Sequence, residues 1–336
     1  MLIDDRDDLK RCIRACVRGL ALVDVATRLD IADPQMGVDA ALRSIAPDES
    51  PDAAFARLMI DGTPLSRAAQ DVVAALDRLN MPQGDLPLVR MREQAMTPGA
   101  YLEAVRAQAG LAAALSPVTP GAYEGERAAE FLVPTLDLAA CRGEAGRYAE
   151  GYAERARALS AFVKEKNIRD ATLGLADAGA LADGWTRYAF FPLCEDAGLA
   201  LTVGLSDGAA LSALLTDLRT FPRLRAAAWC ARAEDEAALV AAAAELGGRL
   251  LPCIRPESIP LALEGDRPRF ILRPSLARVA DRTIGYWRRM RAQTARTLYE
   301  CYLPLLRSGF ALTDQGVEQD ILRMMHTGFA ALHGEI

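Results

Sequence analysis

Short runs of apolar and β-branched residues recur along this chain, and most are followed by a turn signal and a segment with helical spacing of apolar positions. This alternation is typical of a parallel sheet covered by helices. Eight runs qualify as strands, which is the number that closes a (β/α)8 barrel. They lie at residues 20–26, 110–117, 129–136, 170–176, 199–205, 224–230, 249–254 and 269–274.

Two further stretches have the pattern of helices. The long connection between the first two strands contains residues 37–108, where Pro and Gly breaks separate helical segments, and we predict a helical insertion standing over one end of the barrel. Residues 280–336 predict long C-terminal helices, the last of them capped by Thr313 or Asp314. We therefore expect residues 1–336 to form a single α/β domain, a (β/α)8 TIM barrel with these two helical additions.

An open, doubly wound sheet is the alternative that the same alternation permits. Two features of the sequence favour the barrel. The first strand is not followed by the G-x-G-x-x-G loop of dinucleotide-binding folds, because residues 24–30 read D-V-A-T-R-L-D, and no phosphate-binding Walker loop occurs in the sequence. The number of predicted strands also fits a barrel.

The composition excludes several partners. The chain of 336 residues is 51% hydrophobic and has a net charge of −6, without a block rich in Lys and Arg, so we expect no nucleic acid partner. No apolar run approaches the roughly 20 residues that span a bilayer, so we expect no membrane partner either. An acidic start and seven scattered cysteines favour a cytoplasmic protein with reduced thiols.

The chemistry of a barrel lies at the carboxyl ends of its strands. Asp24 and Arg28 follow the first strand, and Asp24 could act as a general base if burial raises its pKa. Arg28 could polarise a carbonyl oxygen beside it. The same two residues could equally form a structural salt bridge.

Arginines are frequent at the other predicted strand ends, and a guanidinium group binds carboxylate or phosphate in a bidentate manner. An aromatic side chain near a strand end could stack on a sugar ring, although aromatic residues more often fill a core. We therefore predict an anionic small molecule, a sugar acid or a phosphate, as a partner, and a homo-oligomer is compatible with the sequence. The candidate substrate-binding residues are Arg232, Arg255, Arg273, Arg278 and Trp229, with Arg28 nearby.

Cysteines and aspartates near the strand ends have alternative interpretations. Cys230 and Cys253 could supply a thiolate near Arg232, or be buried structural thiols. Cys12 and Cys16, one helical turn apart, could be half of a metal site or part of a core. Asp24, Asp177 and Asp207 could form a carboxylate site for Mg or Mn, or they could act as helix N-caps.

The first and last strands resemble those of the uronate isomerases, a branch of the metal-dependent amidohydrolases. That family has Asp-x-His-x-His-Leu on its first strand, and this chain keeps Asp24 and Leu29 but has Ala26 and Arg28 at the two histidine positions. In the family an Asp ligand ends the last strand shortly before a Tyr-aromatic-Arg-Arg helix. The same spacing here puts Pro274 at the Asp position.

The family's metal site is not expected here. Its fifth strand delivers another ligand histidine, where this chain offers only Thr202, Val203 or Gly204. The two histidines of the chain, His326 and His333, both fall in the last predicted helix, so no barrel strand supplies the imidazoles that such sites require. We therefore expect neither a metal nor another cofactor.

The resemblance implies a divergent uronate isomerase-like barrel without the His/Asp metal site, which is non-catalytic or binds an anionic sugar acid. The alternative is an intramolecular oxidoreductase, an aldose–ketose isomerase acting on glucuronate or galacturonate without a His-bound metal. A third interpretation is a subunit whose barrel mouth is covered by the helical insertion and which serves only assembly.

Overall fold

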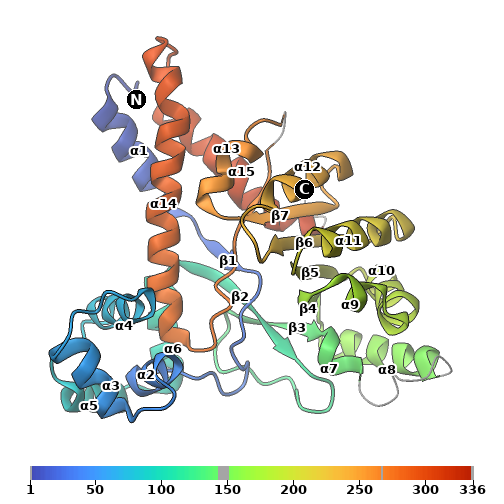
Figure 1. Ribbon diagram of the computed structural model, residues 1–336, viewed down its shortest axis with the longest axis horizontal. Helices are drawn as coiled ribbons and strands as arrows, with labels where there is room; N and C mark the ends of the chain where they lie inside the picture. The colour runs from blue at the N-terminus through green and yellow to red at the C-terminus, as the bar shows by residue number, and fades with distance from the viewer. Residues whose placement is uncertain (1, 143–150, 266–267, 334–336) are drawn as a thin grey trace.

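The sheet consists of parallel strands arranged in chain order. The computed structural model describes residues 2–142, 151–265 and 268–333, and within them eight strands follow one another from β1 to β8 (Figure 1). Every neighbouring pair is parallel. The eight predicted strands are therefore confirmed. They are β1 (Leu22–Asp24), β2 (Leu111–Val118), β3 (Leu132–Asp137), β4 (Asp170–Ala176), β5 (Ala200–Leu205), β6 (Arg225–Cys230), β7 (Leu250–Ile254) and β8 (Ile271–Leu272).

The two edges of the sheet meet just beyond the ends of β1 and β8. The backbone N–H of Leu276 donates to the carbonyl of Ala26 at 3.1 Å, and that of Arg28 donates to the carbonyl of Ala277 at 2.8 Å. The sheet is therefore curled, with its first and last strands side by side. A doubly wound sheet, whose strand order reverses at a switch point, does not fit this sequential order.

The curled sheet has an inner and an outer apolar face, because successive side chains of a strand point to opposite sides. An inner cluster contains Val25, Leu115, Trp229, Cys253 and Ile271 among its buried members. The outer face of the strands joins a much larger cluster that includes buried residues of the covering helices. These two layers of apolar contact hold the strands in the curled arrangement.

Helices also fill the connection between β1 and β2, within the range where an insertion was predicted. They gather around the end of α14 where that helix begins (Figure 1), and α4 and α6 pack directly on it. These helices are α2 (Val38–Ile45), α3 (Pro51–Phe55), the π-helical η1 (Ala56–Ile60), α4 (Arg67–Arg78), α5 (Leu86–Gln94) and α6 (Pro98–Ala109); α14 spans Ala280–Arg307.

The other helices alternate with the strands or close the chain. Helix α15 begins as the sequence predicted, since Thr313 Oγ1 accepts the N–H of Gly316 at 3.0 Å. Within the described residues no helix is both long and apolar enough to cross a bilayer. The remaining helices are α1 (Arg6–Gly19), α7 (Leu138–Arg142), α8 (Tyr152–Glu165), α9 (Ala178–Ala182), η4 (Thr186–Phe190), α10 (Phe191–Ala197), α11 (Gly208–Thr220), α12 (Glu236–Leu246), η5 (Pro256–Ser258), α13 (Ile259–Ala262) and α15 (Asp314–His333).

One arginine joins three helices that are far apart in the sequence. The guanidinium group of Arg291, in the middle of α14, donates to the carbonyl oxygens of Val17, Arg18 and Leu20 at the end of α1. It also donates to the carbonyl of Gly110, directly after α6, at 2.8 Å. Because the last carbonyls of a helix have no partner within it, Arg291 supplies the donors that both helix ends need.

Candidate active site

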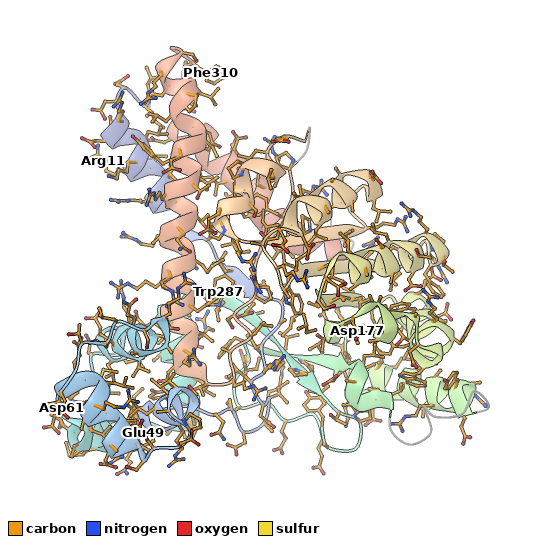
Figure 2. The ribbon with its side chains drawn as sticks, viewed as in Figure 1. Arg11, Glu49, Asp61, Asp177, Trp287 and Phe310 are labelled. Atoms are coloured by element: carbon orange, nitrogen blue, oxygen red, sulfur yellow. The ribbon has the colours of Figure 1, made fainter. Side chains whose placement is uncertain are left out.

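Asp24 lies at the junction of β1, the β8–α14 loop and α14. Its side chain is fully buried, with Oδ1 accepting the N–H of Ser275 at 3.1 Å and Oδ2 accepting Nε1–H of Trp287 at 3.0 Å. Trp287 lies on the side of α14 nearest the strands (Figure 2). Burial raises the pKa of Asp24 to about 6, although the donated hydrogen bonds act in the opposite direction.

The Asp24 carboxylate points to the outer side of the sheet. Asp24 is paired in register with Ala114, which belongs to the outer cluster, whereas Val25 belongs to the inner cluster. Arg28 is exposed, and no ion pair joins it to Asp24 within the described part of the chain. The structure therefore places Asp24 between sheet and helix and does not bring it together with Arg28.

The predicted arginines differ in whether their guanidinium groups already have a partner. Arg28, Arg273 and Arg278 lie around the β8–β1 junction, and in the described part of the chain their guanidinium groups have neither a hydrogen-bond nor an ion-pair partner. Arg255 is bound to Glu236 at 2.7 Å and to the carbonyl of Ala231. Arg232 lies on the surface, 3.6 Å from the exposed Glu234. Arg28, Arg273 and Arg278 therefore have no partner among the described residues that a ligand would have to displace.

Glu236 and Tyr286 are two site-forming residues that the sequence did not single out. Glu236 is fully buried and accepts hydrogen bonds from Arg255 and from the hydroxyl of Ser258, the latter at 2.6 Å. The hydroxyl of Tyr286 donates to the carbonyl of Arg273 at 2.7 Å and also lies 3.0 Å from that of Pro274, and so fixes the end of β8. The Tyr-aromatic pair at the start of α14 was the available signal for Tyr286.

Trp229 fills the inner side of the sheet instead of lining its surface. It is only 2% exposed and belongs to the inner cluster. A Cβ atom placed on Gly204, its neighbour on β5, would lie 2.6 Å from the indole ring, so this close packing requires glycine there. In this conformation Trp229 has little surface on which a sugar ring could stack.

The candidate thiols are buried and protonated at neutral pH. Burial raises the pKa of Cys230 to about 12 and raises that of Cys253 as well. The two also lie on different faces, Cys230 in the outer and Cys253 in the inner cluster. Cys12 and Cys16 line a groove between α1 and α15, where burial raises both of their pKa values. None of these groups has the environment of a reactive thiolate.

Two of the three aspartates proposed for a Mg or Mn site, Asp177 and Asp207, act as helix caps. Asp177 Oδ1 accepts the N–H of Ala180 at 2.7 Å, and Asp207 Oδ1 accepts the N–H of Ala210 at 2.9 Å. Each therefore stabilises the first turn of a helix, α9 and α11 respectively. Among the residues with described positions, no three His, Cys, Asp or Glu side chains lie close enough together to hold a metal ion.

Comparison with known proteins identifies solved structures that share this fold. Neither a protein-family model nor a curated protein matches the sequence. A uronate isomerase from Bacillus halodurans C-125 superposes with a TM-score of 0.85 at 17% identity, over 99% of this chain and 98% of that one. A uronate isomerase from Thermotoga maritima gives 0.65 at 10% identity, over 97% of each chain. The chain therefore has a uronate isomerase-like fold, as its sequence predicted.

Proposed function

We propose that this protein is a divergent uronate isomerase-like barrel that binds an anionic sugar acid and does not catalyse its isomerisation. The observation that carries the proposal is the group of unpartnered arginines at the β8–β1 junction, Arg28, Arg273 and Arg278. The hydrogen bond between the Arg28 N–H and Ala277 holds two of them next to each other along the backbone. A carboxylate is the natural counter-ion for such guanidinium groups.

The side chains at the family's metal-ligand positions do not fit a metal ion. Ala26 and Pro274 carry no side-chain donor atom, and the guanidinium of Arg28 is cationic. Of the three candidates on the fifth strand, Val203 and Gly204 also carry none, and Thr202 offers only a hydroxyl group. In addition, the indole of Trp229 packs against Gly204, at the strand end that resembles the source of a ligand histidine. We therefore derive no reaction step through a metal, and a positively charged arginine replaces a ligand in the proposed site.

The first experiment measures thermal unfolding with glucuronate or galacturonate, and with glucose or galactose at matched ionic strength as neutral controls. A ligand that binds only the folded state raises its stability by about 2.7 kcal/mol at 100 times Kd. We expect Tm to rise with the logarithm of the concentration of each acid once this exceeds Kd, and no rise with the neutral sugars. Equal responses to all four compounds, or no response to any, would overturn the proposal.

A pair of variants locates the site. Replacing Arg28 and Arg278 together by alanine should abolish the rise in Tm that the sugar acids cause. Arg296→Ala, which removes an exposed arginine on α14 that pairs with Glu300, should leave that rise intact. A sugar-acid response that survives the double substitution would place the binding site elsewhere.

A second candidate function is an aldose–ketose isomerase without a His-bound metal. The raised pKa of Asp24, about 6, favours it, because a general base works best when its pKa is near the operating pH. However, both carboxylate oxygens already accept hydrogen bonds, from Ser275 and Trp287. Conversion of glucuronate that Asp24→Asn abolishes, in a variant of unchanged fold, would establish this function, and stoichiometric bound metal in the purified protein would contradict both.

A further inference from the structure

One buried and one partly buried carboxyl group meet where the helices between β1 and β2 dock on α14. Glu93 of α5 accepts the N–H of Val38 at 2.8 Å through Oε1, and Asp281 of α14 accepts the N–H of Gly37 at 2.7 Å through Oδ2. The two acids thus bind consecutive amides at the start of α2. Asp281 is 3% exposed, and Glu93 is partly buried.

Both acids also face one hydroxyl group. Tyr101 of α6 donates to Asp281 through a short hydrogen bond, and Glu93 Oε1 lies 3.4 Å from the same hydroxyl. A tyrosine hydroxyl has a single proton to donate. If Glu93 and Asp281 were both ionised, two negative charges would therefore compete for one hydroxyl proton in a site with little water.

Cations on the surrounding helices do not compensate this charge. On α5, Arg90 is bound to Asp39 of α2, at 3.0 Å, and to Asp52. On α14, Arg282 reaches the hydroxyl of Ser44 at 3.5 Å. The negative charge of Asp39 also faces Glu93. Glu93 and Asp281, which we call the acid pair, thus have Asp39 and the Tyr101 hydroxyl near them, and the nearby Arg90 and Arg282 are bound elsewhere.

We infer that Glu93 and Asp281 hold one proton between them, and that losing this proton loosens the docking of α2, α5 and α6 on α14. The proton makes one carboxyl group neutral and removes the repulsion between the two. Because Ala280 also donates its N–H to the carbonyl of Gln35, the same contact fixes the segment that leads from the β1 end to α2. The acid pair therefore makes the docking of these helices on α14 sensitive to pH.

The direction of the pH effect follows from the pKa of Glu93. Burial, with a contribution from Asp281, raises that pKa from 4.5 to about 7, and burial raises the pKa of Asp281 too. A carboxyl group with a raised pKa stabilises the fold most when both states are protonated, below pH 4.5. This stabilisation is lost as the pH rises from 4.5 to about 7, and no further loss occurs above that range.

The test is urea unfolding of the full chain and of Glu93→Gln at pH 5 and pH 8. Glutamine mimics the protonated acid and keeps an acceptor for Val38. We expect Glu93→Gln to gain stability over the wild type as the pH rises. The folded-to-unfolded ratio of the variant, divided by that of the wild type, should be roughly tenfold or more larger at pH 8 than at pH 5. Glu126→Gln, on an exposed loop, should show the same ratio at both pH values.

A second measurement locates the effect. Hydrogen exchange of wild type and Glu93→Gln, compared at the same pH so that intrinsic rates cancel, should show faster exchange of wild-type α2, α5 and α6 at pH 8 only. Tyr101→Phe should destabilise the chain more at pH 8 than at pH 5, because Asp281 then loses its donor. Equal differences between wild type and Glu93→Gln at both pH values, in unfolding and exchange, would overturn the inference.

Discussion

At the scale of single residues, the hydrogen bond between Trp287 and Asp24 joins α14 to β1. Burial raises the pKa of Asp24 to about 6, so this carboxyl group is ionised at pH 8 and mostly protonated at pH 5. A hydrogen bond to a charged group contributes about 1.5–3 kcal/mol, and one between neutral groups about 0.5–1.5 kcal/mol. The indole donor is therefore worth more at the higher pH.

Trp287→Phe removes that donor and should raise the pKa of Asp24 further. We expect the loss in free energy of unfolding to be about 1 kcal/mol larger at pH 8 than at pH 5. Chemical denaturation at the two pH values measures this difference.

Trp185→Phe is the matched control for that substitution. Trp185 is equally buried, but its Nε1 has no hydrogen-bond partner within the described residues. Replacing Trp185 should lower the free energy of unfolding by the same amount at pH 5 and at pH 8. A pH dependence of equal size in the two variants would show that the Trp287–Asp24 bond is not its cause.

Sequence reasoning at this scale found the right aspartate but not its partners. A carboxylate at the end of the first strand was visible as Asp24, and so was the expectation that burial would raise its pKa. Arg28 was the nearest charged residue in the sequence, whereas the actual donor, Trp287, is 263 positions away. No local pattern encodes such a contact, because it depends on how α14 returns to the sheet.

At the scale of elements, α4 and α14 lie very close to each other at Gly285. A Cβ atom at this position would lie 2.5 Å from Asp71 Oδ1 and 2.6 Å from the Asp71 Cα atom. Because a backbone atom is involved, a change of side-chain rotamer cannot relieve the overlap. The glycine therefore sets the distance between the two helices.

Gly285→Ala should force α4 away from α14 and lower the free energy of unfolding by about 1–3 kcal/mol. Urea denaturation measures the loss. Gly174→Ala provides the comparison, since a Cβ atom there meets nothing within 4 Å. Similar losses for both variants would mean that the general cost of replacing glycine, and not the helix contact, explains the result.

Element boundaries were predictable where local chemistry sets them. The N-caps Asp177, Asp207 and Thr313 precede their helices as the sequence indicated. The first strand was predicted at residues 20–26, but β1 is confined to Leu22–Asp24. A register shift between Leu22 and Val23, together with irregular pairing to the segment after β8, interrupts the ladder. Such irregularities arise from tertiary packing and leave no periodic signal.

At the scale of the whole molecule, the fold could be predicted because eight strand signals recur in order and resemble one family along the chain. The proposed ligand-binding surface could not be predicted in the same way. The sequence placed five arginines near strand ends, but only the structure separates Arg255, which is bound to the buried Glu236, from Arg28, Arg273 and Arg278. That separation depends on side-chain direction and not on position in a strand.

Arg291 is the residue whose loss should affect the largest part of the molecule. Arg291→Ala leaves the carbonyls of Val17 and Leu20 without this donor, while the carbonyl of Gly110 keeps the N–H of Leu22, and we expect the free energy of unfolding to fall by about 2–4 kcal/mol. Arg296→Ala, an exposed position on the same helix, should change it by less than about 0.5 kcal/mol. Comparable losses for the two arginines would contradict this role.

The position of Arg291 also has a consequence for the order of folding. Its acceptors at the two helix ends lie 274 and 181 residues earlier, so neither end receives this donor until α14 is in place. Contacts of such long sequence separation form slowly, because a large loop must close first. We therefore expect α1 to reach its final position late in folding, after α14 has formed.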